Sequence, residues 1–396
     1  MILSIIVVPS ASAGAPESTP DATNLSAQPS VDRHRQTTQL DPSARLLSGG
    51  GASEYWTLYI ELDSGLRMTQ QFLISNAGPG NHNAVAVGHL VEEGREPYRY
   101  TNGRRRARWR LSEDRLFLDI GSSHLDLHRP VGELRITKDD IEIHLFFAFA
   151  ESDVAEPVPS EVLPENYRVD VLAVAAKTEG TVQAPWMAQP IAARGRTWLT
   201  HTWTQSDEAK LLDRRIEIFG GKDEASFYML QLRKRGSFQR SWLLQTVAEG
   251  GNVESIINIP TQWADEFTGA EQHVKRRYAV PDRFRFSQGP DSGLITLSQN
   301  WLRFDPLSVL PQPFRWYVGR KSKPLHIWAD AQIEVRLYQA QETPPPLDTG
   351  ETESGENPLN SGLTSINSKG EIEAEATIRS MTGVASIIFM NPSKRR

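Results

Sequence analysis

The stretch Trp56-Thr-Leu-Tyr-Ile-Glu-Leu-Asp-Ser-Gly65 decides the fold class of this chain. Apolar side chains stand at every second position from Trp56 to Leu62, which is the period of a β-strand with one buried face. Asp63-Ser64-Gly65 has the composition of a tight turn, and the alternation resumes from Met68 to Ile74. The stretch therefore predicts an antiparallel strand pair.

The same alternation recurs along most of the chain, and no long helical periodicity interrupts it. Strand-like segments cover residues 109–120, 134–147, 167–173, 198–203, 214–219, 227–233, 242–247, 253–260, 278–286, 294–302 and 327–338. About sixteen short, regularly spaced strands are typical of barrels or sandwiches. We predict an all-β protein with two lipocalin-like antiparallel β-barrels in tandem, each wide enough for one small ligand.

The domain organisation follows from length and from breaks in the pattern. A chain of 396 residues exceeds the size at which one hydrophobic core stops growing. Pro185 and Pro190 interrupt the strands and predict a crossing between barrels, because proline cannot donate to a sheet ladder. The predicted parts are a possible signal peptide at 1–13, a disordered tether at 14–50, barrels at 51–187 and 188–396, and a flexible insert at about 343–369.

Composition excludes several function classes. The net charge of −6 and the scattered basic residues argue against a nucleic-acid partner. Arg104, Arg105 and Arg106 form one tight basic run, which is either a solvated hairpin tip or a peripheral contact with anionic lipid. The absence of cysteine excludes disulfides, thiolate catalysis and cysteine-based zinc sites. Ten tryptophans, many in strand-like segments, are suited to filling a barrel or lining a pocket.

The amino terminus carries features of an export signal. Ile2 to Val8 is apolar, and Ala11-Ser12-Ala13 matches an A-x-A cleavage site. A basic segment before the apolar run is missing, so a cytoplasmic location stays open. We expect a periplasmic or extracellular protein.

No motif for a cofactor or metal is present. The chain lacks a phosphate-binding loop, a dinucleotide fingerprint, H-E-x-x-H and G-x-S-x-G. His124, Asp126 and His128 would share one strand face, but we interpret them as a surface cluster. We therefore predict no cofactor and no metal.

The segment from Gly195 to Thr204 carries the clearest candidate chemistry. In a strand, Leu199, His201 and Trp203 share a face, so a proton-exchanging imidazole lies beside a flat apolar wall. The alternative is a core histidine whose hydrogen bonds are satisfied, packed beside a tryptophan.

These segments resemble a tandem-lipocalin superfamily that includes AttH-like bacterial proteins, carotenoid hydratases, survival-factor lipid carriers and pericyclase-like enzymes. The strand from Trp56 to Gly65, with Gln71-Phe72 and Ser75-Asn76, is similar to the family's opening hairpin. The segment from Gly195 to His201-Thr-Trp203 is similar to the one that opens its second barrel. The resemblance implies two abutting barrels with a cavity for a hydrophobic ligand.

The resemblance also bears on catalysis. In the hydratase branch, an Asp two residues beyond a Tyr donates a proton to a carbon–carbon double bond. His201, Trp203 and Tyr228 match that pattern, but Leu230 stands where the acid belongs. Leucine cannot donate a proton, and Glu217 or Asp213 could replace the acid only if the strand register turned one inward. We therefore favour binding over catalysis, and the question of an enzyme stays open.

We expect a carrier for a hydrophobic small molecule, of a lipid, isoprenoid or polyketide-like kind. The predicted ligand-binding residues are Trp198, His201, Trp203, Phe227 and Tyr228, with His201 as the polar anchor. The rival is a hydratase, cyclase or isomerase of the same fold acting on a polyene, with His201 and Tyr228 as its catalytic groups. A carbohydrate-binding sandwich is a third class and would present an open aromatic face. The oligomeric state is not predicted.

Overall fold

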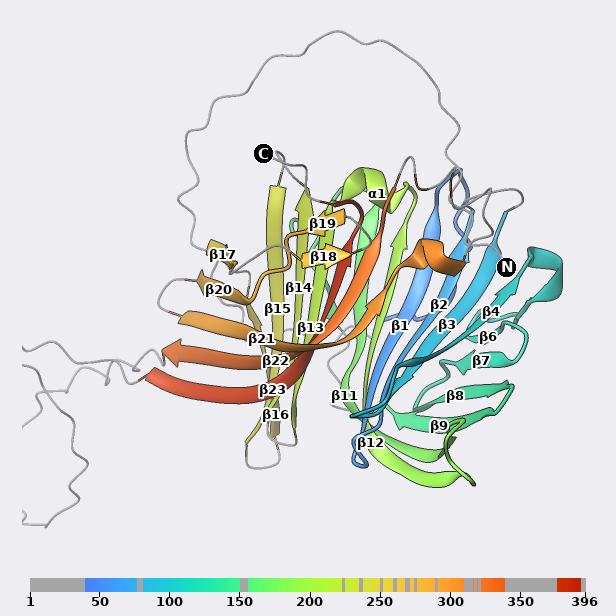
Figure 1. Ribbon diagram of the computed structural model, residues 1–396. Coiled ribbons are helices and arrows are strands. Elements are labelled where there is room, and N and C mark those ends of the chain that lie inside the picture. The colour runs from blue at the N-terminus through green and yellow to red at the C-terminus, as the bar shows by residue number, and fades with distance from the viewer. Residues whose placement is uncertain are drawn as a thin grey trace, which may run out of the picture.

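The computed structural model is built almost wholly of β-strands, so the predicted all-β class is confirmed (Figure 1). It describes residues 40–392, except 77–80, 150–155, 223–224, 235–237, 250–251, 259–261, 268–270, 274–275, 289–290, 310–315, 317–318, 320–321 and 339–375. Helical structure in these ranges includes α1 (Glu208–Leu211) and short 3-10 turns at Arg106–Arg108 and Pro306–Val309. Within the described residues, no helix has the length and apolar character needed to cross a membrane.

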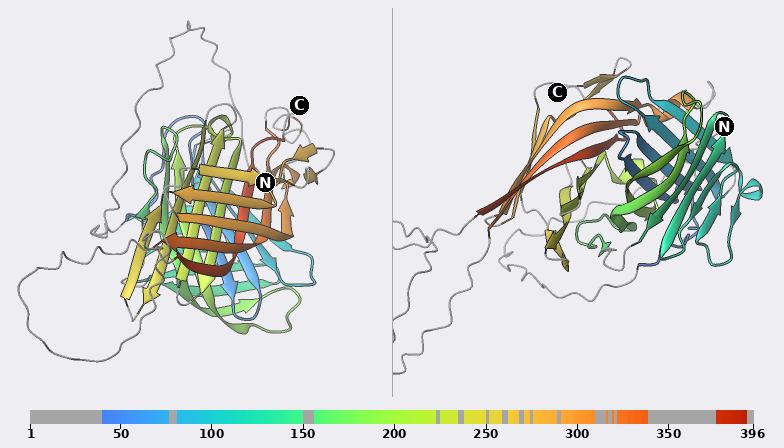
Figure 2. Two further views of the ribbon diagram at one scale, coloured as in Figure 1. Left: turned by 90° about the vertical axis from the view of Figure 1, so that its left-hand side faces the viewer. Right: turned by 90° about the horizontal axis from the view of Figure 1, so that it is seen from below.

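The first sheet runs β4-β3-β2-β1-β12-β11-β9-β8-β7-β6-β5, and β10 pairs with β11. Its strands are β1 (Ser53–Leu62), β2 (Arg67–Ser75), β3 (Asn83–Val91), β4 (Tyr98–Arg104), β5 (Arg110–Leu111), β6 (Phe117–Asp119), β7 (Ser123–Asp126), β8 (Val131–Lys138), β9 (Ile141–Ala148), β10 (Glu156–Pro157), β11 (Tyr167–Gln183) and β12 (Ile191–Thr204). The sheet curls into a nearly closed barrel (Figure 2). Buried Asn102 of β4 bridges the remaining gap by donating to Ser122 Oγ at 3.0 Å and Ser123 Oγ at 2.7 Å.

The predicted opening hairpin is confirmed. β1 and β2 pair antiparallel, with Trp56 opposite Phe72. Gly65 lies in the turn at φ 85°, a backbone conformation that side chains disfavour. The alternating residues Trp56, Leu58 and Ile60 enter the core of the first barrel.

The segment predicted to open the second barrel belongs to the first sheet. β12 pairs along the whole of β1 and also along β11. The residues with Pro185 and Pro190 connect β11 to β12 as a turn instead of crossing between sheets. Gly195 permits this pairing, because a Cβ there would lie 2.0 Å from the Glu61 carbonyl oxygen. The chain changes sheet at residues 205–213, and its division into folding domains stays a prediction.

The second sheet is an open half-barrel with the order β16-β15-β14-β13-β23-β22-β21-β20-β17 (Figure 2). Its strands are β13 (Arg214–Lys222), β14 (Ala225–Lys234), β15 (Phe238–Glu249), β16 (Asn252–Asn258), β17 (Gln262–Glu266), β20 (Arg283–Gln288), β21 (Asp291–Phe304), β22 (Leu325–Tyr338) and β23 (Ala376–Phe389). The short strands β18 (Glu271–His273) and β19 (Arg276–Tyr278) form a separate pair. The last strand, β23, lies between β13 and β22.

The end of the predicted tether is packed against the first barrel, which corrects the expectation that all of 14–50 is disordered. Ala44 is buried in the core of that barrel. Trp56 Nε1 donates to the Pro42 carbonyl at 3.2 Å, and Asn76 Nδ2 donates to the Leu47 carbonyl at 2.6 Å. Backbone carbonyls make part of these contacts, and such contacts leave no periodic apolar pattern in the sequence. The possible signal peptide, the tether before residue 40 and the insert at 343–369 lie outside the described residues.

The buried apolar side chains form three clusters. One fills the first barrel, and another lies inside the second half-barrel. The third contains residues of both sheets, so it lies where they face each other. We call this interface the seam.

Candidate functional site

Strand alternation decides which side chains reach the seam. On β12, Trp198 belongs to the seam cluster, whereas its neighbour Leu199 belongs to the core of the first barrel. On β14, Tyr228 faces the seam, whereas Phe227 faces the inside of the second half-barrel. Each sheet therefore contributes one face to a shared interior.

Stacked aromatic rings connect the two sheets across the seam. Tyr59 of β1 lies 5.4 Å from Trp198 and 5.8 Å from both Phe219 of β13 and Trp328 of β22, measured between ring centroids. Trp301 of β21 continues the series at 5.8 Å from Trp328. The aromatic cluster gives the seam a large apolar surface with fixed shape.

An open cleft of about 870 Å³ lies at one edge of the seam. β2, β3 and the segment after β3 line one side, and β21 and β22 line the other. Val91, Trp301 and Leu302 line the cleft and also belong to the buried seam cluster. Outer residues of the aromatic seam cluster thus form part of the cleft wall.

Arg67 of β2 spans the cleft. Its guanidinium makes an ion pair with Asp330 of β22 and lies 4.7 Å from the ring centroid of Trp301. The side chains of Arg67 and Asp330 are 19% and 36% exposed. This contact joins the two sheets at a place that solvent still reaches.

Two histidines face the seam near the cleft. His89 of β3 lines the cleft, and its Nδ1 lies 3.2 Å from Thr69 Oγ1. Burial lowers the pKa of His89 to about 4, and nearby Arg99 adds to the shift. Burial likewise lowers the pKa of His326 to about 3, and its Nε2 lies 2.7 Å from Ser386 Oγ. Both imidazoles are therefore neutral at pH 7.

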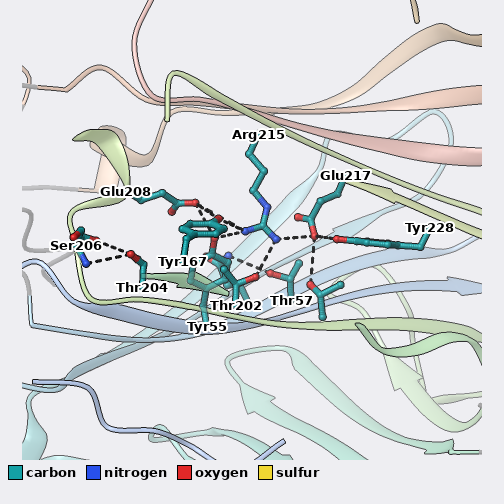
Figure 3. A network of polar contacts seen from close by, with 12 residues as sticks. Tyr55, Thr57, Tyr167, Thr202, Thr204, Ser206, Glu208, Arg215, Glu217 and Tyr228 are labelled. Carbon is teal, nitrogen blue, oxygen red and sulfur yellow. Dashed lines mark hydrogen bonds and ion pairs between the residues drawn. The ribbon is translucent and has the colours of Figure 1, made fainter. Parts of the chain in front are cut away.

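A buried polar network occupies the seam between β1, β11, β12 and β13 (Figure 3). Arg215 of β13 is fully buried. It donates from Nη1 to Tyr55 OH at 2.5 Å and Tyr167 OH at 2.6 Å, and from Nη2 to Thr202 Oγ1 at 3.0 Å. The guanidinium of the second sheet is thus held by hydroxyls of the first. A buried charge persists only with such partners.

Glu217 is the counter-charge of this network. Its Oε1 accepts from Arg215 Nη2 at 2.8 Å, Tyr228 OH at 2.8 Å and Thr200 Oγ1 at 3.4 Å. β13 and β14 pair so that Glu217 lies opposite Leu230. The register therefore places a buried carboxylate beside Leu230.

His201 lies on the opposite face of β12, inside the first barrel. Its Nε2 donates to Glu54 Oε1 at 2.9 Å, and its ring stacks on Trp56 at 4.4 Å between centroids. Burial lowers the pKa of His201, although its contact with Glu54 opposes the shift. Glu54 also accepts from the backbone N–H of Arg45 at 2.7 Å and Leu46 at 3.2 Å. His201 thus joins a structural network that fastens residues 45–46.

The structure brings together only two of the five predicted ligand-binding residues. Trp198 and Tyr228 share the seam cluster. Trp203 is half-buried beside His201 on the first-barrel side of β12, and Phe227 is in the second half-barrel. The two faces of each strand point into different interiors, so residues that are neighbours in the sequence lie in separate clusters.

Sequence reasoning missed the cleft residues and Arg215. In Arg214-Arg-Ile-Glu-Ile-Phe219, charges alternate with isoleucines, which normally indicates one solvent face. Because a second sheet covers that face, the charges are buried and paired. The cleft combines β2, β3, β21 and β22, which only the tertiary fold brings together.

Comparisons with known proteins agree on the fold. No family model matches the sequence, and no curated protein matches it. A putative AttH from Nitrosomonas europaea is similar with TM-score 0.53 and 10% identity, over 85% of this chain and 91% of that one. Kievitone hydratase from Nectria haematococca gives 0.51 and 10%, over 91% and 98%. CghA gives 0.52 and 10%, over 92% and 98%. The predicted resemblance to the tandem-lipocalin superfamily is thus confirmed at the level of the fold.

Proposed function

We propose that this protein binds an apolar small molecule in the cleft at the edge of the seam. One observation carries the proposal: the cleft of about 870 Å³ shares the lining residues Val91, Trp301 and Leu302 with a buried aromatic cluster. Small-molecule sites are commonly concave and of about 300–1,000 Å³, with apolar and aromatic side chains in their lining. Val91, Trp301, Leu302 and Phe304 supply the apolar part of this lining, and most of the other lining residues are charged. A lipid, an isoprenoid or a polyketide-like compound has suitable chemistry.

Residues of both sheets form the binding site in this proposal. Val91 comes from β3, and Trp301 and Phe304 come from β21. From the sequence-based set we keep Trp198 and Tyr228 as supporting residues, because they belong to the same buried cluster as Val91, Trp301 and Leu302. The cleft residues take the place of His201, Trp203 and Phe227, which face other interiors.

The hydrogen bonds of Glu217 favour a carrier over an enzyme. Adding a proton to an alkene requires an acid that can release one. Glu217 Oε1 accepts hydrogen bonds from three donors, one of them the guanidinium of Arg215. Glu217 thus serves as hydrogen-bond acceptor and counter-charge for the buried guanidinium, which is a structural role.

Co-purification and binding test the proposal. Mass spectrometry of an organic extract of the purified protein is expected to detect one apolar compound in near-stoichiometric amount. After extraction, that compound should quench tryptophan fluorescence on rebinding.

Trp301→Leu should weaken rebinding by about 10-fold or more, because it removes a large aromatic wall. Trp263→Leu is the matched control, since Trp263 packs on Phe284 and Phe286 in the half-barrel. Equal losses in both variants would place the site elsewhere, and absence of any bound or binding apolar compound would refute the carrier.

The second candidate is an enzyme that hydrates, cyclises or isomerises a polyene. The position of Glu217 beside Leu230, hydrogen-bonded to Tyr228, favours it. Incubation with acyclic polyenes tests for products, and Glu217→Gln should lower any rate by about 10²–10⁴, the usual contribution of one acid–base group. His201→Ala tests the other candidate proton donor, which lies inside the first barrel and not in the seam. Turnover that depends on either residue would overturn the carrier, whereas no turnover with any polyene supports it.

A further inference from the structure

We propose that the cleft recognises an uncharged oxygen-bearing group, a hydroxyl or carbonyl, at one end of its ligand through Trp301 and His89. This inference rests on the proposed binding function and specifies the chemistry of the ligand. Three features of the cleft carry it: two buried nitrogen atoms without partners, a balanced set of charges, and a side chain that can move.

Trp301 and His89 each hold a nitrogen that has no hydrogen-bond partner among the described residues. These atoms are Trp301 Nε1 and His89 Nε2, and both are buried. The two side chains are 8% and 6% exposed and line the same cleft from different sheets. Leaving such groups unpaired is costly, and a ligand oxygen that reached them would remove the cost. A hydroxyl suits either tautomer of His89, because it both donates and accepts.

The charges around the cleft balance. The lining includes four arginines and four acidic residues, Arg67, Arg95, Arg99, Arg303, Glu92, Glu93, Glu96 and Asp330. Arg67 pairs with Asp330, and Arg95 pairs with Glu92. Because burial lowers the pKa of His89 to about 4, that residue adds no positive charge at pH 7. A cleft without excess charge does not concentrate either anions or cations.

Arg67 is the side chain that must yield to a ligand. It lies over the Trp301 ring, and both unpartnered nitrogen atoms are buried with the guanidinium in this position. Its ion pair with Asp330 is partly exposed to solvent, and pairs of this kind contribute little stability. The guanidinium can therefore turn outward at small cost, and the apolar body of the ligand then packs on Trp301 and Phe304.

A matched series of dodecyl compounds tests the inference on the intact protein. Dodecanol, dodecanoate, dodecyltrimethylammonium and dodecane share one chain and differ at its end, and displacement of fluorescent N-phenylnaphthylamine measures their affinities. Dodecanol is expected to bind more tightly than the two charged compounds and dodecane. Trp301→Phe should lower the affinity for dodecanol by about 2- to 10-fold, which is the contribution of one neutral hydrogen bond. The affinity for dodecane should not change. Trp242→Phe is the control, because it removes an unpartnered indole N–H of the seam cluster that does not line the cleft.

The outcomes separate this inference from the proposed function. Tighter binding of dodecanoate or of dodecyltrimethylammonium would overturn the recognition of an uncharged group while binding itself stands. Equal losses of dodecanol affinity in Trp301→Phe and Trp242→Phe would overturn the assignment to Trp301. If no dodecyl compound and no fluorescent reporter binds, the proposed function fails as well.

Discussion

The Arg215–Glu217 pair offers the sharpest test of how the two sheets are joined. Glu217→Leu removes the nearer carboxylate of a fully buried guanidinium and leaves it only Glu208, at 3.9 Å, as a charged partner among the described residues. Removing one partner of a buried ion pair costs about 3–5 kcal/mol. Arg215→Met leaves the carboxylate with Tyr228 and Thr200 alone and should cost about the same.

The double variant distinguishes a buried pair from two exposed charges. With both charges gone, Tyr55 and Tyr167 keep hydrogen bonds to Glu208 at 3.0 and 2.6 Å. Tyr55 and Tyr167 each lose only the hydrogen bond from Arg215, whereas Thr202, Thr200 and Tyr228 lose the contacts with Arg215 or Glu217 described above, so Arg215→Met with Glu217→Leu should cost about 1–3 kcal/mol. The double variant is thus predicted to be more stable than either single variant, although it carries more changes.

Urea unfolding followed by far-UV circular dichroism measures these differences, compared where the slope of the transition is unchanged. Arg285→Met is the control, because Arg285 pairs with Glu266 at an exposed site and should change the unfolding free energy by less than about 1 kcal/mol. Additive costs in the double variant would refute the buried pairing and, with it, the close contact of the sheets.

Three further outcomes follow from the structure. Gly195→Ala should lower the unfolding free energy by at least about 1–3 kcal/mol, because its Cβ would meet the Glu61 carbonyl at 2.0 Å; an unchanged urea midpoint would contradict the β1–β12 pairing. Since the pKa values of His89 and His326 are lowered to about 4 and about 3, the unfolded chain binds protons first as pH falls below about 6.5. The contribution of His89 to stability should thus be constant above that pH and fall by about 1.4 kcal/mol per pH unit down to about pH 4, a loss that His89→Phe removes in urea titrations. Asn102→Ala should cost about 1–3 kcal/mol by opening the gap between β4 and β7, and hydrogen exchange should then increase selectively along these strands.

The fold was largely predictable because alternation is a local property. Residues 56–74 carry both strands and the turn, so the sequence alone defines the first hairpin. The place of β12 was not predictable in the same way. Its pairing with β1 joins residues about 140 positions apart, and the reason for Gly195 is visible only when the Glu61 carbonyl lies beside it.

The candidate site was predictable only in part, for the same physical reason. Trp198 and Tyr228 were predicted as wall residues from their strands, and the structure brings both into the seam cluster. His201 was assigned to their side, but alternation turns it toward Glu54 in the first barrel. Arg215 resembled a surface residue because nothing in its own strand reveals the sheet that covers it.

Photo-crosslinking tests the location of the ligand most directly. A dodecanol analogue with a diazirine in its chain, irradiated on the intact protein, should label peptides from both sheets, within residues 85–99 of β3 and its following segment and residues 300–304 of β21. Excess dodecanol should suppress the labelling, which controls for nonspecific contact. Labelling confined to the first-barrel core around Trp56 and His201, or to the inside of the half-barrel around Phe227, would contradict a ligand site at the seam.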